Sequence, residues 1–204
     1  NEFRACFGCA GLPLVQRLCD KGHAWGRGGV AEIVPNSVMQ GLLGYGYCCP
    51  DMVGGGSFAD FLPGAKAFDA ELFVRYCAAS ALLPMIQFSA APWRVLGEKE
   101  YSYVKSLMEQ RKEYLPVITE LIEHTCKTGE PAVRHMEYVF PGKGLSDCKD
   151  QFMLGDSLLI APCLEKGKSE REVRLPAGKW QSEDGKVYDG GKTVTVTAPF
   201  DRVP

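Results

Sequence analysis

The most conspicuous carboxylate in the sequence is Asp51, which stands where an apolar run ends and a glycine turn begins. Residues 45–50 are expected to form a short buried strand, and residues 51–56 read Asp-Met-Val-Gly-Gly-Gly. Because glycines let backbone or ligand approach closely, a carboxylate at this point either caps the next element or points into a pocket. In the second case Asp51 is a natural candidate for acid–base catalysis.

A second carboxylate, Asp20, lies in the segment Cys-Asp-Lys-Gly-His-Ala-Trp at residues 19–25. Spacing alone favours a helix cap or an exposed loop charge, since glycines follow Asp20. The alternative is a general acid, because partial burial near Trp25 would raise the pKa of the carboxyl group.

Nine cysteines form a third group with possible chemistry. An odd number in a chain of this length disfavours a disulfide framework. Cys6 and Cys9 could join Cys48, Cys49 and His23 in a zinc or redox site, but the second cysteine pair lacks the usual two-residue spacer. Small buried hydrophobic side chains are the favoured interpretation, and they predict a reduced, cytoplasmic protein. The cysteines stand at positions 6, 9, 19, 48, 49, 77, 126, 148 and 163.

Composition narrows the class of protein. The 204 residues are 46% hydrophobic, with a net charge of -2 and a pI of about 6.0, so the chain can bury one large core or two smaller ones. A basic stripe is absent, which makes nucleic acid and anionic membrane poor partners. The sequence has no apolar stretch long enough to span a bilayer and no signal-peptide pattern. The first residue is Asn1 rather than methionine, which predicts an interior part of a longer protein.

Short strands alternate with helices as far as about residue 140. Asp69 is the expected cap of the second helix, Gly129 the expected stop of the third, and Pro116 a kink or break within the third. Alternation of this kind predicts a parallel sheet. We expect strands at 3–9, 45–50, 84–88 and 131–138, and helices at 30–43, 69–83 and 98–126.

Beyond residue 140 the pattern changes to strands and turns. Extended runs are expected at 157–162, 171–175 and 193–198, separated by glycine-containing turns. The sequence therefore predicts two domains, an α/β domain over 1–140 and a β-rich domain over 141–204.

These residues resemble glycoside hydrolase family 31, and the resemblance covers nearly the whole chain. Its most specific marker is Asp-Gln-Phe-Met-Leu-Gly-Asp-Ser-Leu-Leu-Ile-Ala-Pro at 150–162, followed by Leu-Glu-Lys-Gly at 164–167 and Leu-Pro-Ala-Gly-Lys-Trp at 175–180. The Asp-Met-Val-Gly-Gly segment is similar to the family's Asp-Ile-Gly-Gly motif, and residues 129–135 are similar to its last barrel strand. The resemblance implies the carboxyl half of a (β/α)8 TIM barrel over 1–140, followed by a partial β-sandwich over 141–204.

The resemblance also implies roles for residues near the amino end. Asp20 and Trp25 match the family's acid/base segment, in which a tryptophan follows the aspartate by five residues, although Cys19 and Lys21 replace the flanking Gly and Asn. Asp20 is therefore the candidate general acid/base, with Trp25 expected beside the substrate. Arg4, upstream at a strand end, is the candidate substrate-contacting arginine.

Further candidates for contact with sugar lie later in the chain. Asp51 is expected to hold sugar hydroxyls, with capping of the glycine turn as the rival role. Trp93 either stacks on a sugar ring or plugs the core. His135 is a hydroxyl ligand or a packed histidine, and its place at a strand end favours the ligand. Gln87 and Ser89 stand where the family usually has Arg and His. In this respect the sequence is more similar to an animal α-galactosidase-like branch than to the glucosidases.

Cleavage of a glycosidic bond needs one carboxylic acid to protonate the leaving oxygen and, in retaining enzymes, a second carboxylate to attack the anomeric carbon. The family carries this nucleophile in a Trp-x-Asp segment on an earlier barrel strand, and nothing similar precedes Asp20. We therefore predict that the isolated chain is inactive.

The resemblance thus implies a retaining α-glycoside hydrolase, α-glucosidase or α-galactosidase-like, that acts on α-linked oligosaccharides or glycosides without metal or organic cofactor. Two alternatives remain. One is a zinc or redox protein that uses Cys6 and Cys9. The other is a non-catalytic carbohydrate-binding or scaffold relative whose sugar contacts are Arg4, Asp51, Trp93 and His135.

Overall fold

The computed structural model of the chain describes residues 2–4, 8–62, 64–65 and 67–204. Its first part combines three short strands with helices. The strands are β1 (Glu2–Phe3), β2 (Val15–Arg17) and β3 (Cys48–Cys49). The helical elements are the 3₁₀ turns η1 (Val30–Glu32) and η2 (Phe58–Phe61), the short helix α3 (Pro92–Val95), and the helices α1 (Ile33–Leu42), α2 (Ala70–Ala81) and α4 (Glu98–Thr128).

The predicted parallel sheet is present, with strand order β1-β2-β3 and both pairs parallel. Its strands are shorter than expected. In the described part of 3–9, only Phe3 is strand, and only Cys48–Cys49 of 45–50 is strand. The strand expected at 84–88 is reduced to one parallel bridge between Val53 and Phe88. Strand β2 has no counterpart in our expectations, because three residues with two polar side chains give little periodic signal.

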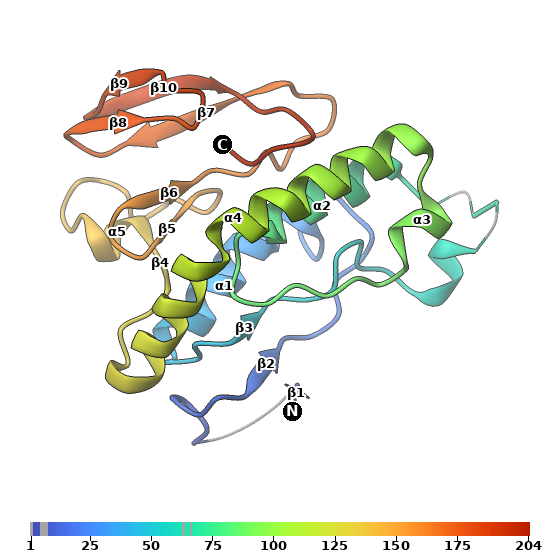
Figure 1. Cartoon of the computed structure of the whole chain (residues 1–204), viewed down its shortest axis with the longest axis horizontal. Helices are drawn as coiled ribbons and strands as arrows, with labels where there is room; N and C mark the ends of the chain where they lie inside the picture. Colours follow the sequence, from blue (N-terminus) through green and yellow to red (C-terminus); the bar gives the residue numbers. More distant parts are fainter. Residues whose placement is uncertain (1, 5–7, 63, 66) are drawn as a thin grey trace.

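The predicted helices are confirmed and lie together on one side of the sheet (Figure 1). Leu72 N donates to the Asp69 side chain at 3.2 Å, so Asp69 caps α2 as expected. Helix α4 continues through Pro116 and ends at Gly129, whose φ is +82°. Of the kink or break expected at Pro116, the break is therefore wrong. Fully buried side chains between the helices and the sheet, such as Phe73, Tyr76 and Leu107, form the main core.

The second part is built from antiparallel strands. It contains the short helix α5 (Met136–Val139) and the strands β4 (Val133–Arg134), β5 (Phe152–Leu154), β6 (Leu158–Ile160), β7 (Glu170–Leu175), β8 (Lys179–Gln181), β9 (Val187–Asp189) and β10 (Lys192–Thr197). The three extended runs expected here are confirmed as β6, β7 and β10. Strand β5 pairs with β4 and β6, while β7 pairs with β10 and β8 with β9.

The strand expected at 131–138 is wrong in length and in partner. Only Val133–Arg134 is extended, and it pairs antiparallel with β5, with Arg134 opposite Met153. His135 then caps α5, because its side chain accepts a hydrogen bond from the Glu137 backbone. This cap turns the chain away from the sheet after two residues.

One buried arginine joins the two parts. Arg75 of α2 is 1% exposed and donates to the backbone carbonyls of Lys168, Ala198 and Pro199 at 2.5, 3.0 and 2.9 Å. Its guanidinium carbon lies 4.0 Å from the centre of the Phe200 ring. Among the residues described above, no helix is long and apolar enough to cross a membrane.

Candidate active site

The carboxyl ends of the parallel strands bring together a cluster of charged side chains around Arg17. Arg17 is the last residue of β2 and is 8% exposed. Its Nη1 donates to Asp51 at 2.8 Å and to Asp20 at 2.9 Å, and its Nε donates to Glu2 at 3.0 Å. Because the carboxyl ends of parallel strands meet at one edge, residues from β1, β2 and the segment after β3 converge here.

Asp51 is a buried anchor of this cluster, only 1% exposed. One carboxylate oxygen accepts from Arg17, and the other accepts from the backbone N–H of Lys21 at 2.6 Å. The glycine turn makes its own bonds, from Gly55 N to Met52 O and from Gly56 N to Lys21 O. Asp51 therefore fixes the Asp20 loop to β2 and caps neither the turn nor the next helix.

Asp20 is the most exposed carboxylate of the cluster, with 58% of its side chain accessible against 33% for Glu2. In addition to Arg17, it accepts a hydrogen bond from Arg4 Nη2 at 2.8 Å. The Arg17 hydrogen bond, with a contribution from the Arg4 charge, lowers the pKa of Asp20 below its ordinary value. The rise in pKa expected from burial near Trp25 is wrong for this structure. Trp25 instead donates its indole N–H to Asp69 at 3.1 Å.

The Asp20 and Asp51 carboxylates share one guanidinium nitrogen and are thus close neighbours. Carboxyl groups about 5 Å apart act as acid and nucleophile in retaining glycosidases. Asp51 does not have the freedom that a nucleophile needs, because both of its oxygens are hydrogen-bonded and the side chain is buried. Asp20 is the member of the pair that a substrate can reach.

The loop that carries Asp20 is held on several sides. The ammonium of Lys21 is buried and donates to Pro50 O at 2.8 Å, and this burial lowers the pKa of Lys21. Gly55 has φ of +56°, and a Cβ atom there would lie 2.7 Å from the carbonyl oxygens of Lys21 and Gly22. Only glycine fits this contact. The ring of His23 links two further segments. Its Nδ1 lies 2.7 Å from the Gly54 carbonyl oxygen, and its Nε2 accepts from the Asp69 backbone N–H at 2.8 Å.

The remaining predicted site residues lie apart from this cluster, and no hydrogen bond within the described ranges joins Trp25, Trp93 or His135 to it. Trp93 is 67% exposed on α3 and is not a core plug. His135 accepts from Glu137 N at 3.1 Å, and its Nε2 lies 2.9 Å from Cys148 O. Both ring nitrogens thus contact backbone, as in a packed histidine.

Comparison with known proteins identifies the family. Residues 129–204 match the model of the glycosyl hydrolase family 31 C-terminal domain. The chain is 33% identical, over 98% of its length, to the myogenesis-regulating glycosidase of Mus musculus, of which it covers 29%. The chain belongs to glycoside hydrolase family 31. The resemblance noted in the sequence is thereby confirmed.

Two further proteins are similar to this family 31 chain. The SITS-binding protein of Tetronarce californica is 31% identical over 89% of the chain, which covers 26% of that protein. The solved structure of the cycloalternan-forming enzyme from Listeria monocytogenes, in complex with pentasaccharide substrate, matches 93% of the chain at 25% identity with a TM-score of 0.80. The chain covers 19% of that enzyme, and it spans less than a third of each of the three relatives.

The cysteines of the family 31 chain are mostly buried. Burial raises the pKa of both Cys48 and Cys49 to about 12, as expected for small apolar side chains in a core. Cys6, part of the predicted Cys-Phe-Gly-Cys segment, lies outside the described residues. Within the described ones, no three His, Cys, Asp or Glu side chains are placed to hold a metal ion.

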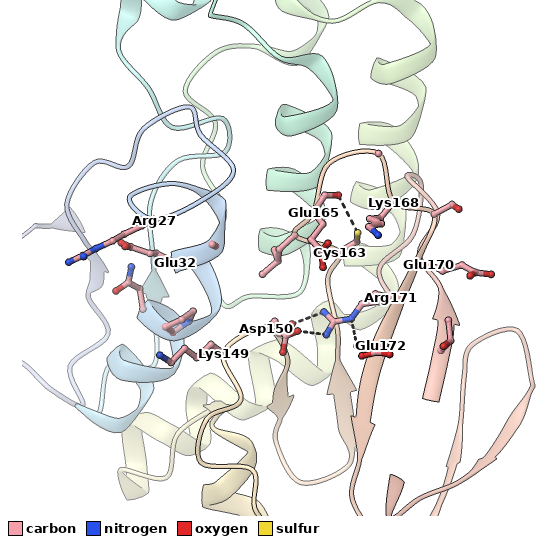
Figure 2. Close-up of a pocket in the computed structure, with 17 residues that line it drawn as sticks. Arg27, Glu32, Lys149, Asp150, Cys163, Glu165, Lys168, Glu170, Arg171 and Glu172 are labelled. Carbon is pink, nitrogen blue, oxygen red and sulfur yellow. Dashed lines mark hydrogen bonds and ion pairs between the residues drawn. The ribbon is translucent and has the colours of Figure 1, made fainter. Parts of the chain in front are cut away.

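A large cleft lies away from the Arg17 cluster. It measures about 1260 Å³, and its lining includes Arg27, Glu32 and Lys149 on one side and residues of β7 on the other (Figure 2). Its walls carry charges of both signs. The guanidinium of Arg171 is already held there by Asp150 at 2.8 Å and by the Pro162 carbonyl at 2.5 Å. We therefore place the candidate active site at the strand ends.

Sequence reasoning missed the residue at the centre of the cluster. Arg17 precedes Asp20 by three residues, and the signal that could have found it is the short Leu-Val-Gln-Arg-Leu run that ends in a charge. Glu2 was also missed, although it bonds both Arg17 and Gln87. Neither can be recognised until the parallel pairing of β1 with β2 brings them together.

Proposed function

We propose that the chain forms the carboxyl half of a (β/α)8 barrel and part of the following β-sandwich in a retaining α-glycoside hydrolase, α-glucosidase or α-galactosidase-like. The parallel β1–β3 sheet with its helices on one side supports the barrel. One observation carries the function. Asp20 is an exposed carboxylate at the carboxyl edge of these strands, where barrel enzymes place their catalytic groups, and two arginines orient it.

In this proposal Asp20 acts as general acid in the first step and as general base in the second. The ionised form that Arg17 and Arg4 favour is the form that accepts a proton from water. A substrate that draws Arg4 onto a sugar hydroxyl removes one positive charge from Asp20 and desolvates it. Both changes raise the pKa of Asp20 toward the range of a proton donor.

The attacking carboxylate is proposed to come from outside these 204 residues. Asp51 is the neighbouring carboxylate, and its burial and its bonds to Arg17 and Lys21 assign it to positioning. The isolated chain would then bind an α-linked oligosaccharide or glycoside without cleaving it.

A non-catalytic carbohydrate-binding relative is the second candidate. The lowered pKa of Asp20 favours it, because a carboxylate held by two guanidinium groups is a good acceptor for hydroxyls and a poor acid. One relative of the chain is named for binding rather than for hydrolysis, namely the SITS-binding protein. In this case the same side chains would bind the sugar, and the glycosidic bond would not be cleaved.

A panel of aryl α-glucosides and α-galactosides, assayed with the complete protein and with the isolated chain, tests the proposal. We expect turnover by the complete protein, none by the isolated chain, and a loss of about 10²- to 10⁴-fold in kcat for Asp20→Ala. Asp184→Ala, in an exposed turn of the β-rich part, is the matched control and should keep full activity. Turnover by the isolated chain, or an unimpaired Asp20→Ala variant, would contradict the proposal. Saturable sugar binding without turnover by the complete protein would support the second candidate.

A further inference from the structure

A second, smaller pocket lies beside the glycine turn. It has a volume of about 580 Å³ and is mostly apolar. Its lining includes Phe58 and Phe61 of η2 and Arg94 and Val95 of α3. Met52 and Gly56 of the glycine turn also line it.

Aromatic packing holds the walls of this pocket in place. The Phe61 and Phe68 rings meet edge-to-face, with centroids 6.0 Å apart. Behind them the His23 ring stacks on Phe68 at 5.4 Å, and Phe73 of the core contacts both phenylalanines. At the rim Phe58 is 82% exposed. An exposed aromatic ring next to a preformed apolar pocket is typical of a ligand site.

Among the described residues that line this pocket, Arg94 has the one charged side chain. It forms no ion pair with any carboxylate in the part of the chain that the structure describes. The carboxylate of Asp60 in η2 accepts from the backbone N–H of Ser57 at 2.6 Å and from the Ser57 hydroxyl at 3.1 Å. The guanidinium of Arg94 is therefore available for an anionic group.

The pocket adjoins the loop of the candidate acid. Gly56, in its lining, donates its N–H to Lys21 O at 2.7 Å, and Lys21 follows Asp20 directly. Ser89, also in the lining, donates to the Gly55 carbonyl at 3.0 Å. The pocket and the loop that carries Asp20 are thus joined by the contact between Gly56 and Lys21.

We propose that this pocket binds the leaving group of the substrate and selects an aromatic aglycone that carries an anionic substituent, which Arg94 recognises. This inference rests on the proposed glycosidase function and specifies its substrate class. Phe58 and Phe61 contact the ring system, and the Arg94 guanidinium pairs with a carboxylate or another anion at its far end. The sugar itself lies at the Arg17 cluster.

Two isosteric substrates test the assignment in the complete protein. They are the α-glycosides of 6-hydroxy-2-naphthoate and of 6-hydroxy-2-naphthamide, which share ring and linkage and differ in charge. We expect KM to be at least tenfold lower for the carboxylate, with a similar kcat. Arg94→Gln should abolish this preference by raising KM for the carboxylate to the value for the amide. Arg27→Gln, which removes a charge from the large cleft, is the matched control and should keep the preference.

A second experiment separates this inference from the proposed function. It measures the affinity of the protein for each of the two free naphthols by a fluorescence titration. If neither glycoside is cleaved, Arg94-dependent binding of the naphthoate over the naphthamide still supports the pocket while the glycosidase proposal fails. Equal KM values for the two glycosides would overturn the assignment of Arg94. A preference that survives in Arg94→Gln, or equal affinity for the two naphthols, would overturn it as well.

Discussion

Oδ1 of Asp51 lies 2.8 Å from Nη1 of Arg17, in an ion pair whose carboxylate is 1% exposed. This contact joins the end of β2 to the residues that follow β3. The same Nη1 atom reaches Asp20, so the buried pair sets the position of the exposed carboxylate.

Arg17→Met should destabilise the chain strongly, because it leaves the charge of Asp51 buried without its partner. Removal of one member of a buried pair lowers the free energy of unfolding by about 3–5 kcal/mol. Urea denaturation measures this change. The double variant Arg17→Met/Asp51→Leu should lose less than the sum of the two single variants. Strict additivity would show that the two side chains are not coupled.

The Asp20 carboxyl should titrate below the ordinary aspartate pKa of about 3.9, since Arg17 and Arg4 both favour its charged form. Folding is then favoured above the unfolded-state pKa, and this contribution is lost as the pH falls through the lower folded-state pKa. Because the side chain is mostly exposed, the contribution is small and screened by salt. Carboxyl NMR titration checks this, and Arg4→Gln should raise the pKa. A midpoint that Arg4→Gln does not move would contradict the Arg4–Asp20 pair.

Gly55→Ala should displace the Asp20 loop. The added methyl group would lie 2.7 Å from two carbonyl oxygens, at a φ of +56° that L residues avoid. Backbone strain and overpacking together should lower the free energy of unfolding by about 2–4 kcal/mol. Gly142→Ala is the matched control, because Gly142 has φ of +70° and a Cβ atom there would have no neighbour within 4 Å. Thermal unfolding of both variants measures the difference, and equal losses would mean that the contact with the Asp20 loop contributes nothing.

Arg75→Met should loosen the β-rich part from α2. It removes three hydrogen bonds to the carbonyls of residues 168, 198 and 199 and the contact with Phe200. Bonds to charged groups contribute about 1.5–3 kcal/mol each, so a loss of more than 3 kcal/mol is expected. Hydrogen exchange should also rise selectively in β7 and β10. Arg27→Met, an exposed arginine, should change neither quantity.

Local sequence signals located the helices well, for reasons visible in the structure. Asp69 caps α2, and Gly44 and Gly129 adopt positive φ where α1 and α4 end. Pro116 did not break α4, because tertiary packing of buried residues on both sides, such as Leu107 and Ile118, holds the helix together. The chemistry of each cap or stop residue is local, so the sequence carries it.

The candidate site was only partly predictable. Asp20, Arg4 and Asp51 do converge, but Arg17 joins them, and it belongs to a strand too short to show a period. The direction of the Asp20 pKa shift depends on that unseen partner. The expected shift had the wrong sign for this reason. Side-chain pairing across strands is a tertiary property, and neither spacing nor composition encodes it in a form that can be read directly.

The dependence of catalysis on the leaving group tests the role of Asp20 most directly. In the complete protein, kcat/KM of wild type and Asp20→Ala is compared on an unactivated α-linked disaccharide and on a 2,4-dinitrophenyl α-glycoside. A general acid matters most when the leaving oxygen needs a proton. We predict near-complete loss on the disaccharide and a much smaller loss on the dinitrophenyl substrate. Equal losses on both substrates would contradict the assignment of Asp20 as the general acid/base.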